Sequence, residues 1–273
     1  MQRIPPGLPG TVPRCIAREL GELTTASLLY PLGCTALGSR SLLRALVPAP
    51  TPAAVRHHTP TFLVPGYGGN HSSWFPLEQR LMRAGFSNIH IPSYNSVIMG
   101  VPDMARALVE DCRAAMRAVG ADYVHLVGHS LGGIVIRYAI QRLGLAPHVR
   151  TAVTVAAPHR GTRLALLALG GAAASVRPGS SLLEDLRRTS CPSRIRWVAY
   201  YSDSDLVVRP SSARLQESVL RAENFLVPDV GHLGILRAAP FLESVVPRLV
   251  DGQNLPREKV AVSLRPERSV AAA

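Results

Sequence analysis

The sequence predicts an α/β fold in which helices flank both faces of a mostly parallel central sheet. From residue 61 onward, short β-branched or apolar runs alternate with longer helical patterns, which is typical of repeated βαβ units. Hydrophobic residues make up 47% of the chain but aromatic residues only 5%, so Ala, Leu, Val and Ile must build the core. A chain of 273 residues is long enough to bury one sizeable core of this kind.

Strands and helices follow one another along residues 61–251 in the alternating order that a parallel sheet requires. The apolar and β-branched runs predict strands at residues 61–64, 88–91, 124–127, 151–155, 195–201 and 224–227. The helical patterns predict helices at residues 74–84, 102–119, 131–143 and 240–249. The second helix has Pro102 in its first turn and Gly120 just past its end, which are the positions these residues favour.

Two segments flank this folded domain of residues 61–251. Prolines surround the N-terminal appendage, residues 1–60, in which residues 20–46 are apolar but interrupted by charges and by Pro31. This stretch falls short of the about 20 apolar residues of a membrane span. We therefore expect short helices that pack on the domain or associate weakly with a membrane surface. Residues 252–273 are polar and charged without a strong pattern, which predicts a loose tail.

The formal net charge of +12 raises the question of a nucleic-acid partner. Lys259 is the only lysine, and the arginines are scattered, with Arg187 and Arg188 as the only adjacent pair. This distribution indicates an arginine-rich composition rather than a basic patch, so we expect no nucleic-acid partner. The Pro-rich start lacks the order of a signal peptide, which favours a cytoplasmic or membrane-associated protein over a secreted one.

The four cysteines, Cys15, Cys34, Cys112 and Cys191, lie far apart in the sequence. They form no CxxC pair and have no histidine beside them at metal-ligand spacing, so we expect no zinc site. Cys112 falls in the predicted helix at 102–119 and is expected to behave as a small apolar residue. The other three are either free or paired.

The strongest chemical motif is the run VHLVGHSLGG at residues 124–133, in which an apolar strand leads into Gly-x-Ser-x-Gly and then into a helical pattern. In this context Ser130 lies in a tight strand-to-helix turn, and Gly128 and Gly132 allow the close backbone packing of that turn. The N–H groups at the start of the following helix favour the negative charge of a tetrahedral intermediate. The motif therefore predicts that Ser130 is a nucleophile rather than part of a chance Gly-rich turn.

A serine hydroxyl needs a base to accept its proton and a carboxylate to orient that base. With this type of turn, the carboxylate and then the histidine follow the serine along the chain. Of His148, His159 and His232, only His232 also follows an acidic residue at a strand end, in a Gly-flanked loop after the last predicted strand. We therefore expect His232 to be the base.

Two aspartates compete for the role of the carboxylate, because the strand at 195–201 is followed by the run SDSDLVVRP. Asp205 precedes an apolar turn that ends in Pro210, which fixes its carboxylate just beyond the strand, where active sites of parallel sheets lie. Asp203 fits a turn residue that bonds its own backbone. We prefer Asp205, with Asp203 as the alternative.

The run PGYGGN at residues 65–70 follows the first strand of the domain, where a second backbone N–H for an oxyanion is expected. We assign the two donors to the backbone amides of Tyr67 and Leu131. A Gly-rich loop can also hold a phosphate group, but this one lacks the Gly-Lys-Ser/Thr end of a P-loop and the dinucleotide spacing. Phosphate binding by this loop is the lesser alternative.

Residues 160–193 are long for a link between two strands and are rich in Ala, Gly, Leu and Ser. One interpretation is a small lid over the site, because long loops of this kind are often functional. The other is an ordinary crossover helix at residues 163–169 followed by a surface loop.

The run around Ser130 and the run AAPHRGT at residues 156–162 resemble the lipase and esterase branch of the α/β-hydrolases, particularly compact bacterial triacylglycerol lipases. The resemblance covers about residues 61–249. The second run looks like the Thr-Pro-His-x-Gly-Thr segment of these lipases, which makes His159 a structural residue near the cleft. The family usually has His-Gly before the oxyanion residue, whereas this chain has Pro65-Gly66.

This resemblance implies an α/β-hydrolase fold and hydrolysis of carboxylic esters, with a lipid or other small acyl ester as the substrate and an acyl-enzyme on Ser130. Water activated through His232 would release the acyl group. We expect no metal, no calcium and no organic cofactor. An acyltransferase, a thioesterase or an amidase on the same residues is an alternative, as is a non-catalytic binding or membrane-associated module.

Overall fold

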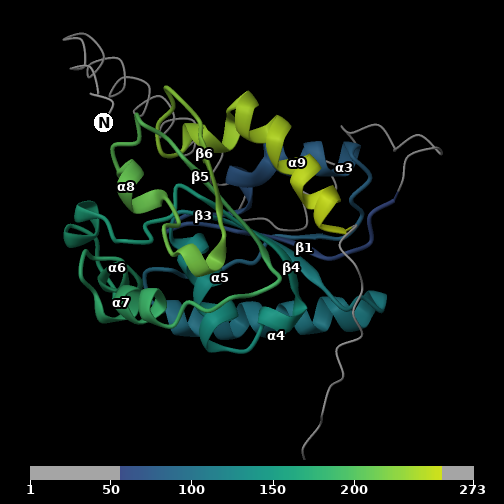
Figure 1. The fold of residues 1–273 in the computed structure, drawn as a ribbon, viewed down its shortest axis with the longest axis horizontal. Helices are drawn as coiled ribbons and strands as arrows, with labels where there is room; N and C mark the ends of the chain where they lie inside the picture. Colours follow the sequence, from purple (N-terminus) through teal and green to yellow (C-terminus); the bar gives the residue numbers. More distant parts are fainter. Residues whose placement is uncertain (1–55, 254–273) are drawn as a thin grey trace, which may run out of the picture.

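A computed structural model describes residues 56–253 of the chain (Figure 1). The predictions for the appendage up to residue 55, including the apolar stretch 20–46, lie outside the described residues. So do the predictions for Cys15, Cys34 and the tail from residue 254 onward.

Six strands of the described chain form one parallel sheet in the order β2-β1-β3-β4-β5-β6. They are β1 (Thr61–Val64), β2 (Ile89–His90), β3 (Val124–His129), β4 (Val149–Val155), β5 (Arg196–Tyr201) and β6 (Glu223–Leu226). Each lies where the sequence predicts a strand, and the ends differ by at most two residues. Parallel neighbours need crossover connections, which confirms the predicted α/β class.

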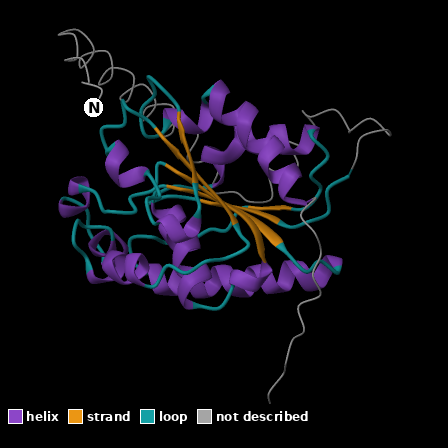
Figure 2. Cartoon of the chain, viewed as in Figure 1, coloured by secondary structure: helices purple, strands orange, loops and turns teal. Residues whose placement is uncertain are grey.

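Helices cover both faces of this sheet (Figures 1 and 2). On one face α3 (Phe75–Arg83) packs against α9 (Ala239–Gln253), and on the other α4 (Val101–Val119) packs against α5 (Leu131–Arg142). All four predicted helices are therefore present. The tail predicted from residue 252 begins too early, because α9 continues to Gln253. The short elements η1 (His71–Trp74), η2 (Ala146–His148), α8 (Pro210–Ala213), η4 (Ser218–Leu220) and η5 (Gly234–Arg237) lie in the connections.

The hydrophobic core is divided by the sheet into two clusters of buried side chains. Phe62 and Leu126 belong to the cluster beneath α4 and α5, whereas their neighbours Leu63 and Val127 belong to the cluster beneath α3 and α9. Successive strand residues point to opposite faces, and both faces are covered, so the strands are apolar throughout. Cys112 is a buried free thiol in the first cluster, as predicted, and Cys191 is a free, exposed thiol.

The segment at residues 160–193 contains η3 (Arg163–Leu166), α6 (Gly171–Ser175) and α7 (Ser181–Arg188). The predicted crossover helix at 163–169 is wrong, because only a short 3-10 helix forms there and two helices replace the expected surface loop. The chain turns at Gly170, which has φ 89° and whose Cβ, if present, would lie 2.1 Å from the carbonyl oxygen of Val97. Only glycine tolerates this turn.

No helix among residues 56–253 is both long and apolar enough to span a membrane. At the carboxyl edge of its parallel strands, the described domain presents four loops that carry the candidate site residues. β1 leads to the loop with Tyr67, β3 to Ser130, β5 to the loop with Asp205, and β6 to the loop with His232. Because parallel strands all end at the same edge, the fold gathers these four loops at one end of the sheet.

Candidate active site

Ser130 lies between β3 and α5, in the turn that the Gly-x-Ser-x-Gly motif predicts. Its backbone has φ 50° and ψ −122°, and such a conformation costs a residue other than glycine about 1–3 kcal/mol. The N–H of Ser130 donates to the carbonyl of Val155 at 2.8 Å, and its own carbonyl accepts from Gly133 at 3.0 Å. The neighbouring strand and helix therefore hold the strained turn in place.

The two glycines of the motif are required because backbones approach closely there. A Cβ on Gly132 would lie 2.2 Å from the carbonyl oxygen of Val64, and a Cβ on Gly128 would lie 2.6 Å from the carbonyl oxygen of Gly132. Backbone atoms cannot yield to such contacts without moving β1, β3 or α5. The glycines therefore allow the loop after β1 to reach Ser130.

Asp205 and His232 form a buried pair at the same edge of the sheet. Nδ1 of His232 lies 2.8 Å from Oδ2 of Asp205, and the two side chains are 8% and 1% exposed. The other carboxylate oxygen, Oδ1, accepts the N–H groups of Val207 and Val208, both at 2.8 Å. An ionised carboxylate only accepts, so Nδ1 of His232 carries the proton and Nε2 presents a lone pair.

His129 contacts the same histidine, although the sequence predicted no role for it. Burial lowers its pKa to about 3 by disfavouring the charged imidazolium, and His232 adds to this effect. The neutral ring donates from Nε2 to the carbonyl oxygen of His232 at 2.9 Å, across 103 residues of sequence. The only sequence feature that could have indicated a role for His129 is its position directly before Ser130. Its contact with the backbone of His232 is known only from the fold.

The loop after β1 lies directly against Ser130. A Cβ on Gly66 would lie 3.0 Å from Cβ of Ser130, so Gly66 allows this approach. Gly66, Tyr67, Ser130 and His232 share a small cavity of about 60 Å³. The hydroxyl of Tyr67 donates to the carbonyl of Leu169 at 2.9 Å, which connects this loop to the segment 160–193.

Ser130 and His232 also line a larger cavity of about 610 Å³. This volume lies within the range of about 300–1,000 Å³ that is usual for small-molecule sites. Tyr67 and Leu131, the predicted oxyanion donors, line it too. Its other walls come mainly from small and apolar residues, several of them in the segment 160–193: Pro158, Thr162, Leu164, Ala165, Ala168, Ala173, Val176, Val207 and Leu233.

Two residues considered from the sequence lie elsewhere. Asp203 is exposed and accepts the N–H of Asp229 at 3.0 Å, so it serves a turn. His159 is buried, contacts Oγ1 of Thr154 at 3.1 Å and does not line the cavity. Burial and the charge of Arg137 hold the pKa of His159 well below its usual value. Among residues 56–253, no group of three or more His, Cys, Asp or Glu is arranged to hold a metal ion.

The fold and the serine turn define the class of this chain, which is a serine hydrolase of the α/β-hydrolase fold. A family model described as palmitoyl protein thioesterase matches residues 72–211, just over half of the sequence. The chain belongs to the palmitoyl protein thioesterase family. The matched residues include Ser130 and Asp205 and end before His232.

Solved structures of hydrolases from other organisms share the fold. A mature lipase of Bacillus licheniformis is 21% identical with a TM-score of 0.57, over 74% of this chain and 95% of its own. The monoacylglycerol lipase of Paleococcus ferrophilus is 14% identical with a TM-score of 0.59, over 71% and 96%. Phospholipase PlaB of Legionella pneumophila is 15% identical with a TM-score of 0.60, over 72% of this chain and 61% of PlaB. These likenesses confirm the predicted resemblance to α/β-hydrolases at the level of the fold.

Proposed function

We propose that this protein hydrolyses carboxylic esters of apolar acyl groups, such as lipid esters, through an acyl-enzyme on Ser130. One observation carries the proposal: Ser130 and His232 line an apolar cavity of about 610 Å³, and His232 is fixed by Asp205 at 2.8 Å. An apolar cavity beside a serine and a histidine of defined tautomer suits an acyl chain with its carbonyl at the serine.

In the proposed reaction, Oγ of Ser130 attacks the acyl carbonyl while Nε2 of His232 accepts the serine proton. Formation of the Oγ–C bond gives a tetrahedral intermediate, and its collapse breaks the bond to the leaving group while His232 donates its proton to the departing alcohol. Water then attacks the acyl-enzyme, gives a proton to His232, and releases the acid as the proton returns to Ser130. Asp205 holds the imidazole in orientation and stabilises its charged form throughout.

The backbone amides of Tyr67 and Leu131 are the proposed donors to the oxyanion of each tetrahedral intermediate. Both residues line the cavity beside Ser130. Leu131 is the first residue of α5, so its N–H has no partner within the helix, and the helix dipole adds to the stabilisation. Fixed donors of this kind are typically worth about 2.7–4 kcal/mol of transition-state stabilisation each.

A second candidate is hydrolysis of acyl thioesters, which the match to the palmitoyl protein thioesterase family favours. The same residues serve this reaction, because only the leaving atom changes from oxygen to sulfur. A thiol is more acidic than an alcohol, so it departs with less help from the protonated His232.

The test is turnover of p-nitrophenyl esters of graded acyl length, with matched acyl thioesters and amides, by the full chain and by Ser130→Ala. A fluorophosphonate probe is applied to both proteins. We expect ester or thioester turnover and probe labelling in the wild type, and loss of both in Ser130→Ala. Relative rates on the three substrate types separate esterase, thioesterase and amidase, and transfer to added alcohols reveals an acyltransferase. A well-folded wild type that neither turns over nor labels would support a non-catalytic module instead.

A further inference from the structure

A second groove, of about 300 Å³, lies beside the active-site cavity. The two share Thr162, Leu164 and Val207 as lining residues. The groove therefore adjoins the cavity in which the proposed acyl substrate would bind. A substrate bound in the cavity can extend a further group into it.

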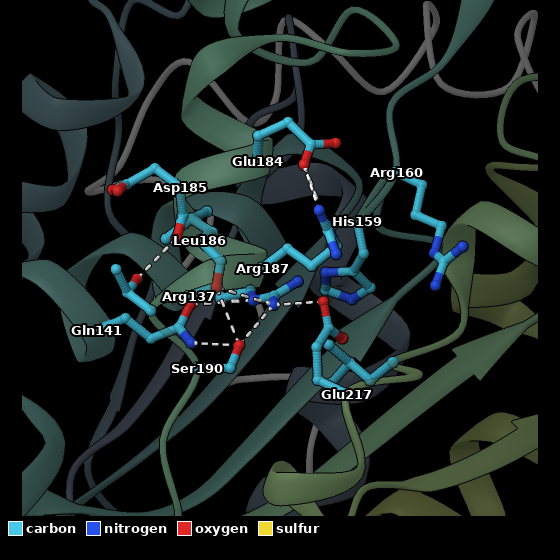
Figure 3. A network of polar contacts seen from close by, with 12 residues as sticks. Arg137, Gln141, His159, Arg160, Glu184, Asp185, Leu186, Arg187, Ser190 and Glu217 are labelled. Atoms are coloured by element: carbon cyan, nitrogen blue, oxygen red, sulfur yellow. Dashed lines mark hydrogen bonds and ion pairs between the residues drawn. The ribbon is translucent and has the colours of Figure 1, made fainter.

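Three arginines, Arg160, Arg163 and Arg209, line this groove, and we call it the arginine groove. No acidic residue lines it within the described part of the chain. All three side chains are exposed, and among residues 56–253 their guanidinium groups form no hydrogen bond or ion pair. In Figure 3, Arg160 stands beside a polar network, and no dashed line for a hydrogen bond or ion pair joins it to another residue drawn. Three cationic side chains are thus left with free donors.

Some exposed arginines elsewhere in the described chain have acidic partners, whereas others, such as Arg113 and Arg117, form no hydrogen bond or ion pair among residues 56–253. Arg187 pairs with Glu184 at 2.7 Å, although both side chains are about half exposed. Asp205 is the acidic residue that lies closest in sequence to Arg209 within the same loop, but its two oxygens are occupied by His232 and by backbone N–H groups. The arginine groove next to the cavity is therefore lined by three cationic side chains and no acidic one, although Arg160 also lines a neighbouring hollow that contains Glu184.

Hydrogen bonds fix the two loops that carry these arginines against each other. The hydroxyl of Ser212 donates to the carbonyl of Gly161 at 2.7 Å and accepts the N–H of Arg160 at 3.2 Å. The hydroxyl of Thr162 donates to the carbonyl of Val207. The backbones that carry the guanidinium groups are therefore ordered before any ligand arrives, which lowers the entropic cost of binding.

We propose that the arginine groove binds a phosphate group carried by the leaving group of the acyl substrate. The guanidinium fork matches phosphate oxygens with two parallel hydrogen bonds, and several such groups suit a phosphate better than a singly charged carboxylate. This inference rests on the proposed function. The acyl group is transferred to Ser130 as the carbon–oxygen or carbon–sulfur bond breaks, and the phosphate-bearing alcohol or thiol leaves with the proton from His232.

Two kinds of substrate carry this chemistry. A lysophospholipid has an ester whose alcohol is a glycerophosphate, and an acyl-coenzyme A has a thioester whose thiol carries nucleotide phosphates. Each has a neutral counterpart with the same acyl group and the same scissile bond. 1-Octanoylglycerol 3-phosphate is compared with 1-octanoylglycerol, and octanoyl-coenzyme A with S-octanoyl-N-acetylcysteamine. The short acyl chain keeps all four compounds monomeric.

The experiment measures kcat/KM of the full 273-residue chain on both pairs, at low and at high salt. The variants are Arg160→Gln, Arg163→Gln, Arg209→Gln and the triple variant, and the control is Arg117→Gln, an exposed arginine on α4. We expect the wild type to prefer the phosphate-bearing member of at least one pair, and the preference to fall with salt. Each single variant should lower that preference about two- to fivefold through KM, as expected for one exposed charge contact.

The triple variant should abolish the preference while turnover of the neutral compounds and the behaviour of Arg117→Gln stay as in the wild type. The pair that shows the preference identifies the source of the phosphate. Equal kcat/KM within both pairs, or the same loss in Arg117→Gln, would overturn the inference and leave the proposed function intact. If no compound is hydrolysed, the proposed function fails. Phosphate binding by the groove is then tested separately by calorimetry, which compares the affinity of Ser130→Ala for the phosphate-bearing compounds with that of the same variant lacking the three arginines.

Discussion

Side chains in the site are oriented by backbone groups as well as by one another. Asp205 has one oxygen on His232 and the other on two backbone N–H groups, so its carboxylate cannot rotate without breaking hydrogen bonds. His232 is held in turn through its own carbonyl, which accepts from the neutral ring of His129. A carboxylate can only accept from Nδ1, so it keeps the proton on that nitrogen, whereas an amide can also donate to Nδ1. The tautomer of His232 therefore depends on the carboxylate of Asp205.

Replacement of Asp205 by asparagine tests this dependence. The amide nitrogen of Asp205→Asn can donate to Nδ1, which favours the tautomer with the proton on Nε2 and removes the lone pair that the proposed reaction requires. We expect kcat to fall about a thousand- to ten-thousand-fold with little change in KM. Steady-state kinetics on a p-nitrophenyl ester measure this.

Asp203 provides the matched control, because it lies two residues away, is exposed and serves a turn. Asp203→Asn should retain kcat within about a factor of two, since it contacts no reacting group. The opposite ranking of the two variants would move the carboxylate role to Asp203.

Elements meet at the site through backbones rather than side chains. The start of α5 touches the end of β1 where a Cβ on Gly132 would lie 2.2 Å from the carbonyl oxygen of Val64. Gly132→Ala must push these elements apart, so we predict a loss of about 3 kcal/mol or more in the free energy of unfolding. Urea denaturation measures it. Gly171→Ala in α6 is the control, because the nearest atom to the added Cβ would be 3.9 Å away. The free energy of unfolding of this variant should stay unchanged or rise slightly.

A buried arginine joins three elements behind the site. Arg137 on α5 is fully buried and reaches the carbonyl of Leu186 on α7, the hydroxyl of Ser190 and, at 2.8 Å, the carboxylate of Glu217 (Figure 3). Burial lowers the pKa of Arg137, and Glu217 opposes that effect. The guanidinium is thus a buried charge that depends on one carboxylate.

Removal of that carboxylate should therefore be costly. We predict that Glu217→Gln lowers the free energy of unfolding by about 3 kcal/mol, because it leaves the charge of Arg137 uncompensated. The double variant with Arg137→Met should recover much of this loss, since neither charge remains. Arg187→Gln breaks a surface ion pair with Glu184 and should leave the urea midpoint unchanged within error. If Glu217→Gln is as harmless as Arg187→Gln, the network does not hold these elements together.

The strand, turn and helix around Ser130 could be predicted because ten consecutive residues encode them. Chain order pointed to His232 and Asp205, which the fold brings within 2.8 Å, and their catalytic roles stay predictions. Of the two interpretations of residues 160–193, the crossover helix at residues 163–169 is wrong. Leu166, Leu167 and Leu169 are in fact exposed at 59%, 82% and 77%, so no core organises a helix around them. The contact of His129 with the loop of His232 joins segments 103 residues apart, and only the fold reveals it.

The molecule as a whole buries several histidines in its two cores. His125 is the second residue of β3 and is fully buried, and neither ring nitrogen has a hydrogen-bond partner among the described residues. Burial lowers its pKa from 6.5 to about 3, helped by the positive charge of Arg150 and by His57. His129 is likewise lowered to about 3. The folded chain therefore keeps these rings neutral where the unfolded chain would protonate them.

This difference makes the fold sensitive to acid. Below about pH 6.5 the unfolded chain binds protons at these positions and the folded chain does not, so stability falls as the pH is lowered, until the folded pKa near 3 is reached. Each such histidine contributes up to about 1.4 kcal/mol per pH unit within this window.

His125→Leu removes one titrating ring, so its free energy of unfolding should decline less steeply between about pH 7 and pH 5. Urea denaturation at several pH values gives the slope of the free energy of unfolding against pH for the wild type and for His125→Leu. The slope is compared because a change in packing shifts the free energy of unfolding equally at all pH values. Equal slopes in His125→Leu and the wild type would mean that His125 takes up a proton inside the folded chain.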